Sequence, residues 1–490
     1  MEPAAAGKVL IEKLGATKDP LTVADASARS GLALRDAESG LTYLTAEYRG
    51  HLRVTDDGDL IYLFPTGFEK PWETKEQWER TLAKVGSALV GAGRFVVRAW
   101  ILIAMVGYAL LFVALLIGLS MAGNRRDDRG PGAGLIGVLF RAIADAVFWT
   151  ARPFSPVYII PIGYEDDSWG RSQQRQRAAQ RDREEVPFYE RVNRFVFGPK
   201  QPPPDPLVTR ANILSAIRIG KGRIGLSDVM RVTGLPRDEA DPLMARLMLD
   251  HDGSVEVSDA GGIYYVFPEM RRTAGDEWNG LPFPARGPLA AWDTPKTVPP
   301  LTGNTSGNNL AIAALNAFNL LASLFMIGQG LTLSNILLLY ATRRQHVPVV
   351  LPDDGMPIAF GLVPLLFSIL IFLMPAFRAL KNKLAEGAVK KENARLQVMK
   401  EVLTHASKKE LVTDEALRNK VRIATGHEPT SKEITRQVVA LGGDVEPGPE
   451  GEIRYRFADL EAEAEALEEE RAHAPEKEAR VGKVVFSSEN

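Results

Sequence analysis

Cysteine is missing altogether from this 490-residue sequence. The chain therefore cannot form disulfides or use a thiolate nucleophile, and it cannot build cysteine-ligated zinc or iron–sulfur sites. An excess of positive charge is missing too, because 59 Lys and Arg face 61 Asp and Glu. A net charge of −2 gives the whole chain no electrostatic attraction to nucleic acid. The N-terminus lacks the charged and apolar regions of a secretory signal, so we expect no export of this end.

Recognisable catalytic motifs are missing as well. The sequence contains no GxGxxG, Walker or GxSxG motif. Its six histidines show neither an HExxH motif nor any other metal-ligand spacing; they are His51, His251, His346, His405, His427 and His473. We therefore predict no catalytic, cofactor-binding or metal-binding residues and no cofactor, and we expect that the chain is not an enzyme.

Long apolar runs, in contrast, are present. Residues 99–123 contain no charge, and a bilayer core requires about 20 apolar residues in a helix, which predicts a membrane span. Residues 134–150 form a shorter run that carries Arg141 and Asp145, and this run is either a short span or an in-plane helix. Together they make a first transmembrane block over 96–150.

A second transmembrane block is predicted over 308–377. We expect one span at about 310–330, then a short interfacial or re-entrant helix, and a last span at 356–377. The polar residues Asn316, Asn319 and Gln329 are the only hint of a transport path. Small and amide side chains in the first of these spans predict close helix packing and self-association; they are Ala313, Asn316, Ala317, Asn319 and Ser323.

One glycine-led aromatic strand occurs three times, as GDLIYLFP at 58–65, GGIYYVFP at 261–268 and GEIRYRFA at 451–458. A shift of 203 residues aligns the first two copies and their upstream regions without a gap. Each copy predicts a helix, a helix–turn–helix and a β-hairpin, which together form a winged helix. We predict such domains over 1–70, 206–270 and 393–460, with first helices at 8–14 and 211–219 in copies one and two. On each hairpin we expect one strand face to cover the helices: Leu60, Tyr62 and Phe64 in the first copy, Ile263, Tyr265 and Phe267 in the second.

The charges on the third helix of each copy bear on what these domains bind. The helices predicted over 34–49 and 237–250 are net acidic, whereas the helix near 430–443 is slightly basic, with Lys432 and Arg436 against Glu433. Affinity for DNA depends on neutralising phosphates with Lys and Arg. The pattern therefore favours protein contacts over nucleic acid.

The connecting segments differ sharply in charge. We predict a basic, proline-rich linker over 151–205, a basic juxtamembrane helix over 378–400 and an acidic tail over 461–490, whose helix at 459–470 should be exposed to solvent. The first two winged helices should share one compartment, so the chain between them should cross the membrane an even number of times. This favours a span at 134–150, although the three arginines in 124–132 argue against that placement.

The two strands GDLIYLFP and GGIYYVFP, the segment ERVNRFVFG at 190–198 and the apolar blocks resemble an uncharacterised integral membrane protein family of cyanobacteria, plastids and other bacteria. The resemblance covers the chain to about residue 400. Plant members are sometimes labelled iron–sulfur cluster biosynthesis proteins, but this chain has no cysteine to hold a cluster. The resemblance implies the architecture and no catalytic residue.

These observations predict an α+β multidomain membrane protein with three small winged-helix domains separated by helical transmembrane blocks. We expect a scaffold or adaptor in the bacterial inner membrane that contacts lipid, binds a protein partner through its cytoplasmic domains and forms homo-oligomers. A membrane-bound DNA-binding regulator is the first alternative. A transporter or a membrane enzyme of unknown chemistry is the second.

Overall fold

The structure is a computed structural model that describes residues 1–15, 17–68, 99–117, 187–200, 205–274, 287–342, 350, 352–426, 428–449, 451–475, 479 and 481–488. It is a mixed α+β fold with two compact units. The first unit, the repeat unit, combines Met1–Lys75, Pro203–Thr297 and Glu386–Asn490, and the second, the helical unit, combines Glu76–Pro202 and Val298–Ala385. The predicted segment 134–150 and most of the predicted linker 151–205 lie outside the described residues.

The first two repeats have the same elements in the same order. Repeat 1 contains α1 (Pro3–Leu14), β1 (Leu21–Thr22), α2 (Val23–Ser30), α3 (Leu34–Glu47), β2 (His51–Thr55) and β3 (Leu60–Leu63). Repeat 2 contains α8 (Pro206–Ile219), β4 (Arg223–Ile224), α9 (Leu226–Thr233), α10 (Arg237–Asp250), β5 (Ser254–Val257) and β6 (Ile263–Val266). Both first helices begin five residues earlier than we predicted, because a proline at the first helical position already has a suitable φ.

Repeat 3 begins inside the longest helix of the chain that the structure describes, α13 (Val363–Lys408), whose last turns form its first helix. It continues with β7 (Val412–Thr413), α14 (Asp414–Thr425), α15 (Ser431–Ala440), β8 (Asp444–Pro447) and β9 (Ile453–Arg456). After β9 the chain forms α16 (Ala458–His473) and ends with β10 (Val484–Ser487).

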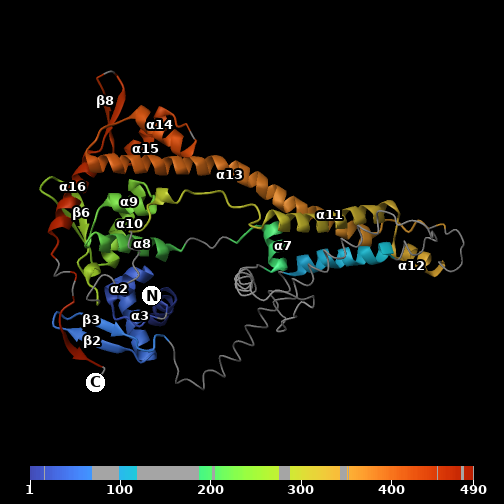
Figure 1. Cartoon of the computed structure of the whole chain (residues 1–490), viewed down its shortest axis with the longest axis horizontal. Helices are drawn as coiled ribbons and strands as arrows, with labels where there is room; N and C mark the ends of the chain where they lie inside the picture. Colours follow the sequence, from blue (N-terminus) through green and yellow to red (C-terminus); the bar gives the residue numbers. More distant parts are fainter. Residues whose placement is uncertain are drawn as a thin grey trace, which may run out of the picture. The chain divides into compact units, whose positions relative to one another are not determined.

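Each repeat has a small antiparallel sheet in which the last hairpin strand lies at the centre. The orders are β1-β3-β2-β10, β4-β6-β5 and β7-β9-β8, and Figure 1 shows β10 in red beside β2 in blue. Tyr62 and Phe64 are buried against the helices of repeat 1, as predicted, and Tyr265 and Phe267 pack in the same way in repeat 2. The prediction was wrong for Ile263, which is 47% exposed because it lies near the hairpin tip, beyond the helices.

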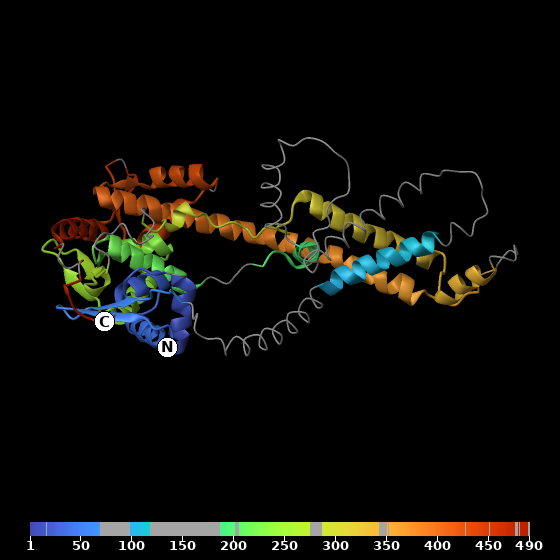
Figure 2. The same cartoon turned by 60° about the horizontal axis from the view of Figure 1, so that its bottom comes forward.

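The helical unit holds the apolar helices. Three described helices are long and apolar enough to cross a membrane: Ala99–Ile117, α11 (Ser306–Gly328) and the helix that starts at Ile358 and includes α13. A short π-helical turn, Ile358–Leu362, precedes α13, and α12 (Leu333–Thr342) follows α11, where we expected an interfacial helix. Figure 2 shows Ala99–Ile117 in cyan beside α11 and the first half of α13.

A short amphipathic helix, α7 (Phe188–Phe197), packs at one end of this bundle. Its apolar side chains join a core that includes Ile101 from the start of the first span and Ile312 from the first turns of α11. The guanidinium of Arg378 donates to the carbonyl oxygens of Phe195 (2.8 Å) and Val196 (2.9 Å) and so satisfies the last turn of α7. The beginning of two apolar helices and the end of the apolar part of α13 therefore lie at the same end of the bundle.

Candidate functional site

The three repeats are joined by contacts that are as buried as those inside each repeat. Between repeats 1 and 2, the Arg218 guanidinium donates to the Asp25 carboxylate at 2.6 Å, and both side chains are 1% exposed. The same carboxylate accepts from the backbone N–H groups of Thr22 (3.0 Å) and Ala274 (3.2 Å). A buried charge pair is retained only where hydrogen bonds of this kind satisfy its remaining atoms. The pair therefore joins the two repeats at a buried contact.

A histidine occupies the same joint. His251 follows α10 and is 0% exposed, and its Nδ1 lies 3.5 Å from the hydroxyl of Ser27 on α2. Burial lowers the pKa of His251 to about 4, because the charged imidazolium would lose its hydration there. The ring is thus neutral at physiological pH and serves as a packing group between the two repeats.

Repeats 2 and 3 share one hydrophobic core. Ile217 and Met230 of repeat 2 lie in the same cluster as Val402 and Phe457 of repeat 3. At its edge the Arg395 guanidinium donates to the carbonyl oxygen of Gly234, at 2.6 Å, where α9 ends. The three repeats form one block.

The helix α16 fastens this block from the outside. We predicted an exposed acidic helix at 459–470, and the helix is present, but its exposure was predicted wrongly for one face. Leu460, Ala466 and Leu467 are buried, and the last two pack on Tyr264 of β6. The run DLEAEAEALEEE hid this face because its five apolar residues are interspersed among seven acidic ones.

One of these acidic residues is itself buried. Glu463 is 7% exposed, and its carboxylate accepts from the backbone N–H of Ser227 at 2.9 Å and from the Ser227 hydroxyl. Ser227 stands in the first turn of α9, so Glu463 fills the N-terminal cap of a helix in another repeat. Burial raises the pKa of Glu463 to about 7, although the two hydrogen bonds from Ser227 lower it.

Two glycines of repeat 2 make room for α16. A Cβ on Gly225 would lie 2.0 Å from Oε1 of Glu463, and a Cβ on Gly262 would lie 2.1 Å from the carbonyl oxygen of Ala462. The residues 203 positions earlier, in repeat 1, are Thr22 and Asp59. Thr22 caps α2 with its own hydroxyl, which accepts from the Asp25 backbone N–H at 3.1 Å. Repeat 2 is thus shaped to receive α16, and repeat 1 is not.

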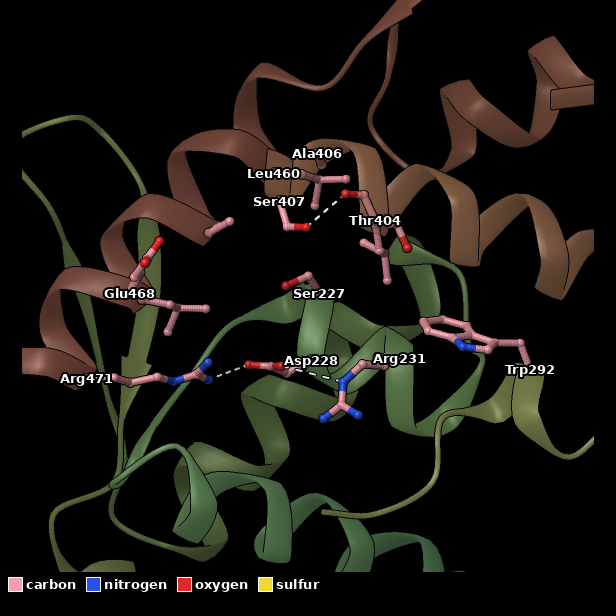
Figure 3. Close-up of a pocket in the computed structure, with 13 residues that line it drawn as sticks. Ser227, Asp228, Arg231, Trp292, Thr404, Ala406, Ser407, Leu460, Glu468 and Arg471 are labelled. Carbon is pink, nitrogen blue, oxygen red and sulfur yellow. Dashed lines mark hydrogen bonds and ion pairs between the residues drawn. The ribbon is translucent and has the colours of Figure 1, made fainter. Parts of the chain in front are cut away.

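A cavity of about 570 Å³ lies between α9, the end of α13 and α16. Figure 3 shows Asp228 at its centre between Arg231 and Arg471, with Trp292 at one side and Thr404 and Ser407 above. Asp228 pairs with Arg471 at 2.5 Å and with Arg231 at 3.8 Å. Asp228 and the two arginines therefore satisfy one another. Ser227, whose hydroxyl donates to Glu463, also lines the cavity.

The polar residues that the sequence singled out and the structure describes form no metal site, and most of them bond within the chain. Among the described residues, no group of three His, Asp or Glu side chains could hold a metal ion. Of the predicted polar residues in the spans, Asn316 donates to the Ser368 carbonyl (2.9 Å) and Asn319 to the Met105 carbonyl (2.8 Å). Asn316, Asn319 and Ser323 are buried within the chain's own helices, whereas Gln329 is exposed. The amide face that we expected to drive self-association is therefore already used inside one chain.

Comparisons with known proteins give one distant relative. The chain is 25% identical over 262 residues to an uncharacterized chloroplastic protein of Arabidopsis thaliana. The aligned part is 52% of this chain and 47% of the relative, so the chain spans about half the length of that protein. No family model matches the chain, and no solved structure matches it.

Proposed function

We propose that this protein is a non-enzymatic scaffold anchored in a membrane, whose three repeats are winged helices that bind other proteins. The main support for the proposal is that the three repeats are joined to one another by buried contacts. Repeats separated in sequence by apolar helices are joined through the Asp25–Arg218 pair and through a shared core. The element order helix, strand, helix, helix, hairpin supports the winged-helix reading of each repeat.

The block also bears on sidedness. Buried contacts between all three repeats require one compartment, and α11 and α13 supply two crossings between repeats 2 and 3. Between repeats 1 and 2 the described helix Ala99–Ile117 supplies one crossing, and α7 returns to the end where this helix begins. We therefore propose one further crossing between 118 and 186. We propose that residues 134–150 make this crossing and that the loop 124–132 lies on the opposite side from the repeats.

Surface charge favours protein partners over DNA for repeats 1 and 2. On α10 the exposed positions include Asp238, Glu239 and Asp241, and the most exposed apolar side chain is Leu249, at 84%. Acidic groups there would repel a phosphate backbone, whereas an exposed apolar side chain suits a protein contact. The α15 helix of repeat 3 exposes Lys432 and Arg436, and this keeps the membrane-bound DNA-binding regulator as the second candidate.

One pair of measurements tests the proposal. The full chain in nanodiscs should bind duplex DNA only weakly, and affinity purification from native membranes should recover a stable protein partner. Tight DNA binding that weakens steeply with salt would overturn the scaffold proposal in favour of the regulator.

We propose that the protein lies in the bacterial cytoplasmic membrane, with the repeats in the cytoplasm and the basic helix near 378–400 at the lipid surface.

Self-association remains part of the proposal, but its basis changes. Since Asn316 and Asn319 bond within the chain, assembly should proceed through the repeats and not through the spans. Light scattering in several detergents should give a mass above that of one chain. Substitution of Asn316 by Leu should destabilise the fold and leave the mass of the remaining folded protein unchanged.

A further inference from the structure

The outer edges of the three hairpins differ in one respect. In repeat 1 the edge strand β2 is covered by β10, which pairs antiparallel with it. In the sheets of repeats 2 and 3, β5 and β8 are the last strands among the described residues. An edge strand offers unpaired backbone groups to any extended segment that reaches it.

The same apolar positions are covered in repeat 1 and uncovered in repeat 2. Leu52, Val54 and Leu60 are partly buried. Their counterparts 203 residues later are Val255, Val257 and Ile263, which are 54%, 65% and 47% exposed. Direct pairing of Val255 with Tyr265 and of Val257 with Ile263 places these side chains on one face of the hairpin. Tyr265 and Phe267 cover the helices at one end of this face, and Val257 and Ile263 lie at the other end, toward the hairpin tip. The other face is closed, because Tyr264 lies under α16.

On the side of β5 that faces away from β6, backbone N–H and C=O groups are available to pair with another strand. In repeat 1 the outward positions of the edge are Leu52, whose carbonyl accepts from the Ser488 N–H at 2.9 Å, and Asp56, whose N–H donates to the Lys483 carbonyl at 2.8 Å. Because outward groups alternate along an antiparallel strand, Val54 is outward as well. The counterparts Val255 and Val257 therefore direct N–H and C=O groups away from β6.

Repeat 3 lacks this arrangement. Pro447 pairs with Ile453 as Val54 pairs with Leu60, so Pro447 stands at the outward position of β8. Proline has no N–H to donate to an added strand, which blunts an edge. In the part of the chain that the structure describes, only the hairpin of repeat 2 combines an uncovered edge, an intact set of outward groups and exposed apolar side chains beside that edge.

We propose that the β5 edge of repeat 2 is a docking site for an extended segment of a partner protein, which pairs as an antiparallel strand and lays apolar side chains beside Val255 and Val257. The occupant's chemistry follows from β10, whose Val484 and Phe486 flank the β2 edge as Cα partners of Thr55 and Val54. A segment with apolar residues at alternate positions, as in β10, fits the edge. This inference rests on the proposed scaffold function and specifies how one partner is held.

The absence of cysteine from the chain makes a direct test possible. Val257→Cys would be introduced into the full chain in nanodiscs and exposed, under mild oxidation, to a peptide of residues 482–488 that carries Phe486→Cys. The matched controls are Leu249→Cys, a more exposed site of the same repeat at 84%, and Val54→Cys, whose edge β10 already covers. A second peptide, with Val484→Pro and Val485→Pro, cannot pair as a strand.

We expect disulfide formation with Val257→Cys at least tenfold faster than with either control, and loss of this advantage with the proline peptide. Equal rates at Val257→Cys and Leu249→Cys, or an unchanged rate with the proline peptide, would overturn the proposal. A fast disulfide between two Val257→Cys chains without peptide would also overturn it, since the occupant would then be a second copy. The crosslink reports on the edge alone, whereas partner recovery and DNA binding test the scaffold function separately.

Discussion

Repeats 1 and 2 share every element at a constant spacing of 203 residues, yet they meet the rest of the chain through different surfaces. Repeat 1 carries Thr22 and Asp59 where repeat 2 carries Gly225 and Gly262, and only the glycines leave space for α16. Conversely, repeat 1 accepts β10 at an edge that repeat 2 leaves open. Duplicated modules thus acquire separate roles through a few small residues, while the hydrophobic pattern that folds them stays the same.

Two aspartates at equivalent positions of repeats 1 and 2 form ion pairs that differ in burial. Asp25 and Asp228 both stand at the third position of their helices and both pair with an arginine from outside the helix. Asp25 and Arg218 are each 1% exposed, whereas Asp228 and Arg471 are 18% and 31% exposed. We expect Asp25→Asn to cost about 3–5 kcal/mol, because it leaves the Arg218 charge buried without a partner. Asp228→Asn should cost about 1 kcal/mol or less. Denaturant titration of both variants measures the difference, and similar costs would contradict it.

Exchanging the small residues for those of repeat 1 should detach α16. Gly225→Thr and Gly262→Asp each place atoms where α16 lies, and we expect a loss of about 2 kcal/mol with faster hydrogen exchange across Ala458–His473. Gly387→Ala is the matched control, since a Cβ there meets nothing within 4 Å. In a helix this change should stabilise by about 0.5–1 kcal/mol. Unchanged exchange in α16 after Gly225→Thr would show that the glycine is not needed for docking.

The contact of His251 between repeats 1 and 2 and the contact of Glu463 between α16 and α9 should respond to pH in opposite directions. The pKa of His251 is lowered to about 4, so its contribution is present above its ordinary value of 6.5 and is lost as the pH falls toward 4. The pKa of Glu463 is raised to about 7, so its contribution is present below 4.5 and is lost as the pH rises through 7. The charged groups near Glu463 are Asp228 and Arg237.

The measurement is thermal unfolding of the full chain and of two variants between pH 5 and 8. Relative to the parent chain, Glu463→Gln should gain stability as the pH rises, by about 2 kcal/mol across this range. His251→Gln should instead gain relative stability as the pH falls, and the Ser27 hydroxyl can still bond its amide. Parallel curves for the parent and Glu463→Gln would show that this carboxyl does not titrate with docking.

The smallest expected effect lies at the two hairpin edges. Val54→Lys should destabilise the chain by about 1 kcal/mol, because Val54 lies beside Phe486 of β10. Val257→Lys should change stability by less than about 0.5 kcal/mol, because that side chain is 65% exposed. Equal losses for both would mean that the β5 edge is covered in solution.

Local pattern was enough to predict the elements of each repeat, but not how the repeats join. Alternation along GDLIYLFP and the glycine turns at Gly31 and Gly234 specify hairpin and helix boundaries within a few residues. The docking of α16 depends on Gly225 and on one carboxylate 238 residues away in the sequence, and no periodicity records such a pair. The buried pair Asp25–Arg218 was missed for the same reason, since each residue reads as an ordinary exposed helix charge.

The glycine at 225 does indicate, from the sequence alone, that α9 needs a capping group from elsewhere in the chain. Aligning the repeats shows glycine replacing a threonine cap at 225, which leaves the N-cap residue of α9 without a side chain. A missing cap calls for a partner from elsewhere in the fold. The surplus of glutamates in the tail could have suggested which segment supplies it.

The central claim is that all three repeats form one block on one side of the membrane. Single cysteines at Ala46, Leu249 and Ile423, one exposed position in each repeat, can be compared with one at Asp128 by labelling intact cells with a membrane-impermeant maleimide. The account predicts that the three repeat positions are protected until the membrane is opened, while position 128 reacts at once. Labelling of any one repeat position in intact cells together with protection of the other two would contradict it.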